Sequence, residues 1–134
     1  MEDIKKKLKN NKLRGHNFER EFVSLLKSKS EVFSKAKTSR EASRLYDDSK
    51  IDVWGIPLLV QLKNTATTPN SRQILKEMDT LIDKNFPKNA QERSLLKCVV
   101  HKKPPGQGKK NDKYTTTVTL TLEDFLDLIT KYYK

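Results

Sequence analysis

A carboxylate, an amide and an ammonium group lie close together in the stretch 51–63. Asp52 comes first, and Gln61 and Lys63 follow after a Gly-Ile-Pro break at 55–57. Two short apolar runs around such a break are typical of a β-hairpin. Because strand side chains alternate between two faces, a loop with an even number of residues would place all three on one face. A metal-dependent phosphodiesterase needs this set: oxygen ligands for a hard cation and a positive group near the attacking water and the phosphate.

A helix predicted from about His16 to Lys29 carries a fourth candidate, Glu19. Its apolar residues recur at helical spacing and form one stripe: Phe18, Phe22, Leu25 and Leu26. At about 100° per residue, Glu19 falls inside that apolar sector, where a carboxylate is costly unless it is paired or bound to a metal. Two alternatives stay open: a glutamate that bends out to water at the helix start, and a half-solvated hairpin with ordinary polar residues outside.

The composition favours nucleic acid as the partner. Lys and Arg outnumber Asp and Glu 28 to 17, which gives a formal net charge of +11 over 134 residues. Such an excess attracts polyanions. No apolar run approaches the length of a membrane span, and the first residues lack the apolar segment of a signal peptide, so no membrane partner is expected. With Cys98 alone no intrachain disulfide can form, and we expect a cytoplasmic protein, in the host cell if it is viral.

The hydrophobic pattern predicts an α/β fold: one domain with a mixed central β-sheet flanked by helices, in the order α-β-β-β-α-β-β-α. Residues 1–15 are expected to form a basic N-terminal arm or short helix, and residues 16–134 a single domain. After a weak strand at 31–38 and the hairpin, the pattern predicts a helix from about 70 to 84, a central apolar strand at 93–101, a strand at 114–121 and a last helix.

Individual residues support the two later helices. Asn70 or Ser71 can cap the first of them, and Thr121 with Asp124 resembles a capping box at the start of the second. In the last helix we expect the apolar side chains to pack against the domain: Phe125, Leu126 and Ile129.

Basic residues in three segments are candidates for DNA contact. The segments are the N-terminal stretch with the first helix, a polar loop at 39–50 that is expected to be mobile, and a Pro- and Gly-rich loop at 102–113. Lysine and arginine side chains there suit phosphate contact, although an ordinary solvated surface is the alternative. The candidates are Arg14, Arg20, Arg40, Arg44, Lys109 and Lys110.

The sequence RGHNFEREF at 14–22, followed by Asp52 and by QLK at 61–63, resembles the archaeal-type Holliday junction resolvases of the PD-(D/E)xK nuclease superfamily. The resemblance covers residues 14–63 and implies a restriction-endonuclease-like fold. By position, Glu19 is similar to the helix carboxylate of these enzymes, Asp52 to the bridging metal ligand and Lys63 to the catalytic lysine. Arg20 resembles a DNA-contacting residue, and Arg40 falls roughly where the family has a basic residue on a mobile loop.

The resemblance implies a Mg²⁺-dependent endonuclease, with Mn²⁺ able to substitute, that acts on branched DNA and leaves 5′-phosphate ends. Asp52, the Gln61 amide oxygen and the backbone carbonyl of Leu62 would hold the metal, and Glu19 would bind through a water or hold a second ion. Lys63 would orient or deprotonate the attacking water. Two symmetric cuts favour a homodimer.

Gln61 departs from the family, which has glutamate at this position. Mrr-like restriction endonucleases carry Gln-x-Lys there, so the amide is compatible with activity in the superfamily. Because the site loses one negative charge, we expect weaker Mg²⁺ binding than in a glutamate-containing site. The alternatives are a Mrr-like nuclease acting on other duplex DNA and a DNA-binding protein that has lost catalysis on the same fold.

Overall fold

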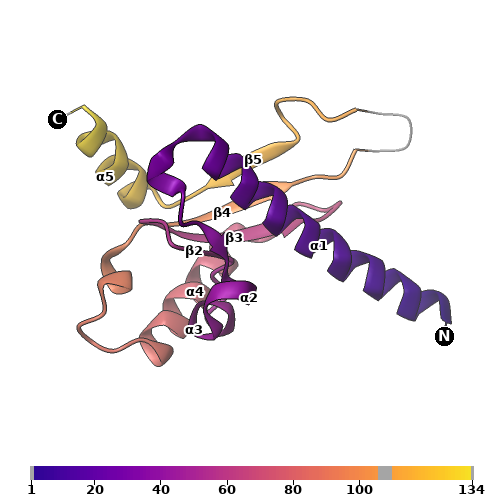
Figure 1. Cartoon of the computed structure of the whole chain (residues 1–134), viewed down its shortest axis with the longest axis horizontal. Coiled ribbons are helices and arrows are strands. Elements are labelled where there is room, and N and C mark those ends of the chain that lie inside the picture. Colours follow the sequence, from indigo (N-terminus) through magenta and orange to yellow (C-terminus); the bar gives the residue numbers. More distant parts are fainter. Residues whose placement is uncertain (1, 106–109, 134) are drawn as a thin grey trace.

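A long helix crosses one face of a small β-sheet and extends beyond it (Figure 1). The structure, a computed structural model, describes residues 2–105 and 110–133. Helix α1 (Glu2–Lys29) packs on the sheet through its C-terminal half, whereas the side chains of residues 3–14 are exposed. The helix predicted to begin near His16 therefore begins at Glu2, and the basic N-terminal segment is part of it.

The central sheet is mixed and three-stranded. Strand β3 (Leu59–Asn64) pairs in parallel with β4 (Lys97–Lys102), which pairs antiparallel with β5 (Thr116–Thr119). Helix α4 (Ser71–Asn85) connects β3 to β4 and covers the face opposite α1 (Figure 1). The central place predicted for the strand at 93–101 is confirmed, since β4 lies between the other two strands.

A second, two-stranded sheet replaces the predicted hairpin. Strand β2 (Val53–Trp54) pairs antiparallel with β1 (Lys37–Thr38) and not with β3. One backbone bond, from Asp52 N to Val60 O at 2.7 Å, links this segment to β3. The ladder does not continue, because the next amide of β3 donates to a side chain, the carboxylate of Asp52. The expectation of one mixed sheet was therefore wrong in this detail.

Two apolar clusters lie on opposite faces of β3. Val60 and Leu62 pack against Phe18 and Val23 of α1, and Leu59 packs in the cluster that α4 supplies. The alternation of β3 side chains thus sends consecutive residues to opposite layers. In this arrangement Gln61 and Lys63 belong to the α4 side.

The remaining elements follow the predicted order with shorter bounds. Residues 31–38 form a 3₁₀ turn (η1, Glu31–Phe33) before β1, and a second 3₁₀ turn (η2, Gln91–Ser94) precedes β4. The predicted cap of α4 is confirmed, because the Asn70 side chain accepts a bond from Gln73 N. The loop expected at 39–50 instead contains two short helices, α2 (Ser39–Ala42) and α3 (Arg44–Asp48).

The last helix, α5 (Leu122–Tyr132), begins at the predicted cap, where Asp124 N donates to Thr121 Oγ1. The expectation that its apolar side chains pack was wrong for two of them, since Phe125 and Leu126 are 46% and 47% exposed, while Ile129 is half-buried. The physical reason is that the side chains of β5 are themselves exposed, so α5 leaves the sheet without a covered surface to pack on. It stands at one end of the molecule (Figure 1).

Two glycines give opposite predictions for stability. Gly55 has a φ of +88°, and a Cβ there would lie 2.7 Å from the carbonyl oxygen of Lys35, whereas a Cβ on Gly15 in α1 would meet nothing within 4 Å. Gly55→Ala should lower the free energy of unfolding by roughly 1–3 kcal/mol, and Gly15→Ala should raise it by about 0.5–1 kcal/mol. Urea denaturation of the two variants checks this. Equal effects would contradict the turn geometry.

Candidate functional site

Asp52 is held against β3 on both sides of Gln61. Its backbone N–H donates to the Val60 carbonyl, and its carboxylate oxygen Oδ2 accepts from Leu62 N, both at 2.7 Å. Its own carbonyl accepts from Ser39 N at 2.9 Å. Asp52 therefore has little freedom to move relative to the strand that carries Gln61 and Lys63.

The Asp52 carboxylate is costly to ionise. Its pKa is raised from the usual value near 4 to about 7, chiefly by burial and in smaller part by the negative charges of Glu19 and Asp47. The bond from Leu62 N and the positive charge of Lys63 act in the opposite direction but do not compensate. At neutral pH the carboxyl is thus poised between its protonated and ionised forms. A cation placed next to it would shift the balance to the ionised form.

Gln61 is buried, with 6% of its surface exposed. Among the described residues, nothing donates a hydrogen bond to its side-chain oxygen Oε1. Buried polar atoms are normally paired, and an unpaired acceptor costs about 1–3 kcal/mol. An amide oxygen in this position can accept a hydrogen bond or bind a hard cation.

Glu19 approaches from α1, which packs across β3. Its side chain is only 12% exposed, in agreement with the buried sector predicted from the helical periodicity, and it forms an ion pair with Arg40 of α2. Arg40 Nη2 donates to both carboxylate oxygens, at 3.0 and 2.8 Å. Arg40, predicted to contact DNA, thus neutralises the helix carboxylate here.

Asp52 is the residue that connects the four predicted catalytic residues, although Glu19 approaches from the α1 side of β3 and Gln61 and Lys63 lie on the α4 side. Glu19 and Lys63 both act on the charge of Asp52, and Asp52 is bonded to the two neighbours of Gln61. Within residues 2–105 and 110–133, no group of three or more His, Cys, Asp or Glu side chains is arranged to hold a metal ion. Position 61 carries an amide and not a carboxylate, so it does not count toward such a group. The second carboxylate near Asp52, Glu19, is already paired with Arg40 through both of its oxygens. The fitting donors for a divalent ion are the Asp52 carboxylate and the unpaired Gln61 oxygen.

Three neighbouring residues were not predicted from the sequence. Asp47 of α3 lies close enough to raise the pKa of Asp52. Ser39, fully buried, donates its backbone N–H to the Asp52 carbonyl, and its hydroxyl meets no hydrogen-bond partner in the part of the chain that the structure describes. His16 lines a hollow with Glu19 and Arg40, and partial burial together with the Arg40 charge lowers its pKa. For Ser39 and Asp47 the sequence carried no signal, because they lie in the segment expected to be a loop.

The predicted DNA contacts differ in their surroundings. Arg14 is exposed and lines three adjoining hollows, and Lys110 lines one of them. Arg20 donates to the Asn17 side chain, and Arg44 forms a long, exposed pair with Asp48 at 3.6 Å. Lys109 lies outside the described residues.

Comparison with protein-family models, with curated proteins and with solved structures yields no match to this chain. In the described part of the chain, no helix combines the length and the apolar character needed to cross a membrane. The function must therefore be argued from the site itself.

The raised pKa of Asp52 predicts an unusual pH dependence of stability. Between about pH 4 and pH 7 the carboxyl loses its proton in the unfolded chain but retains it in the folded one, so the free energy of unfolding should fall as the pH rises. Asp52→Asn keeps an acceptor for Leu62 N without a charge. It should therefore exceed the wild type in stability by roughly 1–3 kcal/mol at pH 8 and by much less at pH 4.5.

Urea denaturation at a series of pH values measures this difference. Asp127→Asn, which changes an exposed carboxylate of α5, is the matched control and should track the wild type. A constant difference between Asp52→Asn and wild type across the pH range would show that Asp52 ionises normally.

Proposed function

We propose that this chain is a Mg²⁺-dependent, structure-selective DNA endonuclease that hydrolyses phosphodiester bonds at branched DNA and leaves 5′-phosphate ends, as a Holliday junction resolvase does. One observation carries the proposal. Asp52, whose carboxyl is poised at neutral pH, is bonded to β3 at Leu62 N, and the preceding residue of that strand, Gln61, has a buried amide oxygen that meets no donor among the described residues. A divalent cation could satisfy both groups. The net charge of +11 and the resemblance over residues 14–63 support DNA as the substrate.

The oxygen donors available are those that Mg²⁺ and Mn²⁺ accept. Asp52, the amide oxygen of Gln61 and the backbone carbonyl of Leu62 would hold the ion. When bound, the ion supplies positive charge that stabilises the charge developing on the phosphate. Glu19 would join through a water, or hold a second ion, once its partner Arg40 turns to another anion.

The chain's own residues would perform the remaining tasks. Lys63, half-buried on the same face of β3 as Gln61, would orient the attacking water and hold or release its proton. The Arg40 side chain is 43% exposed, so its guanidinium can exchange the Glu19 carboxylate for a DNA phosphate. Both groups are anions that can accept two hydrogen bonds from one guanidinium. DNA binding would then free Glu19 at the moment it is needed.

A DNA-binding protein without catalysis is the second candidate. The same ion pair favours it, because Arg40 occupies both oxygens of Glu19 and Gln61 contributes no charge. A nuclease that acts on linear duplex DNA is the third, and it shares every site residue with the first.

Cleavage of a labelled four-way junction and of its component duplexes, in Mg²⁺ and in Mn²⁺, separates these functions. Lys63→Ala should lower the cleavage rate by about 10²–10⁴-fold and leave junction binding intact, whereas Lys84→Ala, on the exposed side of α4, should retain activity. Gln61→Glu should lower the Mg²⁺ concentration needed for half-maximal cleavage. Equal cleavage of junction and duplex would favour the linear-DNA nuclease, and wild-type protein inert in both metals would favour the binding protein.

A symmetric branched substrate also favours a homodimer, and the exposed apolar side of α5 is the surface we propose for it. Its large side chains are between 46% and 80% exposed: Leu122, Phe125, Leu126, Leu128 and Tyr132. Acidic residues lie in its first turn (Glu123 and Asp124) and Lys131 in its last turn. Two copies of α5 packed antiparallel around a two-fold axis would therefore pair unlike charges as they cover the apolar side chains.

The protein should sediment as a dimer at micromolar concentration, and Leu126→Asp should convert it to monomer. Val32→Asp changes a side chain that is 75% exposed on η1 and should leave the dimer intact. Sedimentation equilibrium of the three proteins is the measurement. A monomeric wild type, or a dimer insensitive to Leu126→Asp, would refute this interface.

A further inference from the structure

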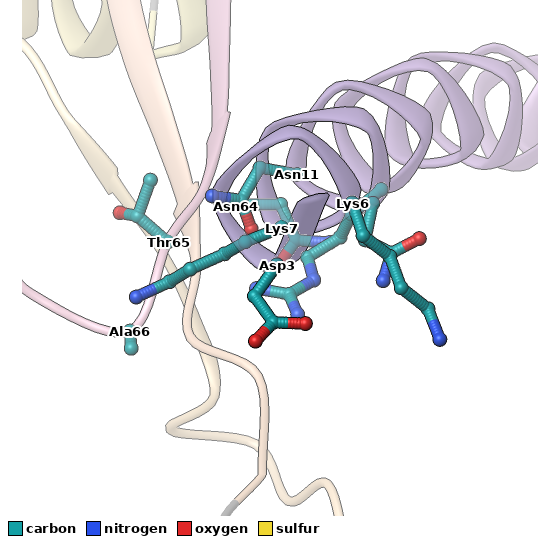
Figure 2. A pocket seen from close by; sticks show the side chains of 9 residues that line it. Asp3, Lys6, Lys7, Asn11, Asn64, Thr65 and Ala66 are labelled. Atoms are coloured by element: carbon teal, nitrogen blue, oxygen red, sulfur yellow. The ribbon is translucent and has the colours of Figure 1, made fainter. Parts of the chain in front are cut away.

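A hollow of about 550 Å³ lies where the N-terminal half of α1 passes the end of β3. Figure 2 shows Lys7 and Asn11 on the side of the helix that faces Asn64 and Thr65, with Asp3 nearby and Lys6 directed away from them. Two further hollows adjoin it. One shares Arg14 and extends to Lys102, and the other shares Arg14 and Ala66 and extends to the hairpin between β4 and β5. Together the three form one continuous depression, which we call the Arg14 groove.

Positive charge predominates along the Arg14 groove. Its basic lining residues are Lys6, Lys7, Arg14, Lys102, Lys103 and Lys110, and its acidic ones are Asp3, Glu21 and Asp112. Glu21 is paired with Lys102 at 3.1 Å. The carboxylate of Asp112, at the hairpin end, is engaged locally by Tyr114 N at 2.8 Å. A groove with cationic edges attracts an extended polyanion.

The floor and one end of the groove offer contacts that a phosphate chain alone cannot use. The side-chain oxygen of Asn64 is buried without a hydrogen-bond donor among the described residues, and a turn of its amide toward the hollow would allow the N–H group of a nucleobase to supply one. Tyr114 is 74% exposed, and Lys113 Nζ lies 5.0 Å from the centre of its ring. An exposed aromatic ring beside cations is a stacking platform for an unpaired base. In a duplex the bases are already paired and stacked, so these two features favour a single strand.

We infer that the Arg14 groove binds a single-stranded segment of DNA, with phosphates along Lys7, Arg14 and Lys103 and a base stacked on Tyr114. The inference deepens the proposed function and depends on it for the choice of DNA as the ligand. Asn64, on the groove floor, directly follows Lys63 on β3. Because consecutive side chains of a strand face opposite sides, a strand in the groove would pass round the end of β3 to reach the candidate site. The substrate we infer is therefore a branch that carries an unpaired strand.

The test is binding of a fluorescein-labelled oligothymidylate and of a duplex, followed by anisotropy, with all proteins carrying Asp52→Asn so that no cleavage occurs. The groove variant is Lys7→Ala/Arg14→Ala/Lys103→Ala. The matched control, Lys76→Ala/Lys84→Ala/Lys88→Ala, removes the same charge from exposed positions on and beside α4. The groove variant should bind the single strand at least about tenfold more weakly, and its slope of log K against log salt should fall by about 2. The control variant should lose much less of its affinity for the single strand.

Substitutions at Tyr114 separate the contribution of base stacking to binding from that of charge. Tyr114→Ala should weaken single-strand binding by about fivefold or more and leave duplex binding unchanged, whereas Tyr114→Phe should retain both. Equal losses in the groove and control variants, or equal losses of single strand and duplex in Tyr114→Ala, would overturn the inference. Cleavage by the protein with Asp52 intact is scored separately. If the wild type cleaves no DNA but the groove variant still loses single-strand binding, only the proposed nuclease activity is refuted. If the wild type cleaves DNA but the groove variant binds the single strand normally, only the groove is refuted.

Discussion

The bond between the Asp52 carboxylate and Leu62 N is the interaction on which the arrangement of the site depends. It stands where the next bond of a β-ladder would form, and it joins the two-stranded sheet to the three-stranded one. A buried carboxylate bonded to a backbone amide cannot move without leaving that amide unpaired. The same bond that fixes the strand geometry therefore also fixes a titratable group next to Gln61.

Around this bond the charges are balanced by local compensation. The positive charge of Lys63 partly offsets the rise in the pKa of Asp52 that burial causes. Arg40 neutralises Glu19, and Gln61 contributes an oxygen without a charge. Without a cation, a third carboxylate at position 61 would add repulsion to a carboxyl whose pKa is already about 7. An amide there keeps the site foldable and costs only an unpaired acceptor. The structure thus accommodates cation-binding groups with little net charge in its interior.

Because the core is small, much of the surface remains available for partners. The apolar clusters lie on the two faces of β3. The first half of α1 projects beyond the sheet, and so does α5 after its first turn, where Asp124 accepts from Lys97 N of β4 (Figure 1). One projection is basic and lines the Arg14 groove, and the other is apolar. Their different chemistry is the reason that we propose different partners for them, a nucleic acid for α1 and a second copy of the chain for α5.

The sequence by itself determined the order of the strands and of the three longer helices, the caps at Asn70 and Thr121 and the position of Glu19 in the apolar sector of its helix, because these depend on contacts within one helical turn or on a local period. Only the tertiary structure decided that β2 pairs with β1, that Arg40 meets Glu19 and that α5 remains uncovered. Each of these depends on which surfaces meet after residues far apart in the chain come together. The unpaired oxygen of Gln61 belongs to the same class, since burial on a strand says nothing about which donors the neighbouring layer will bring.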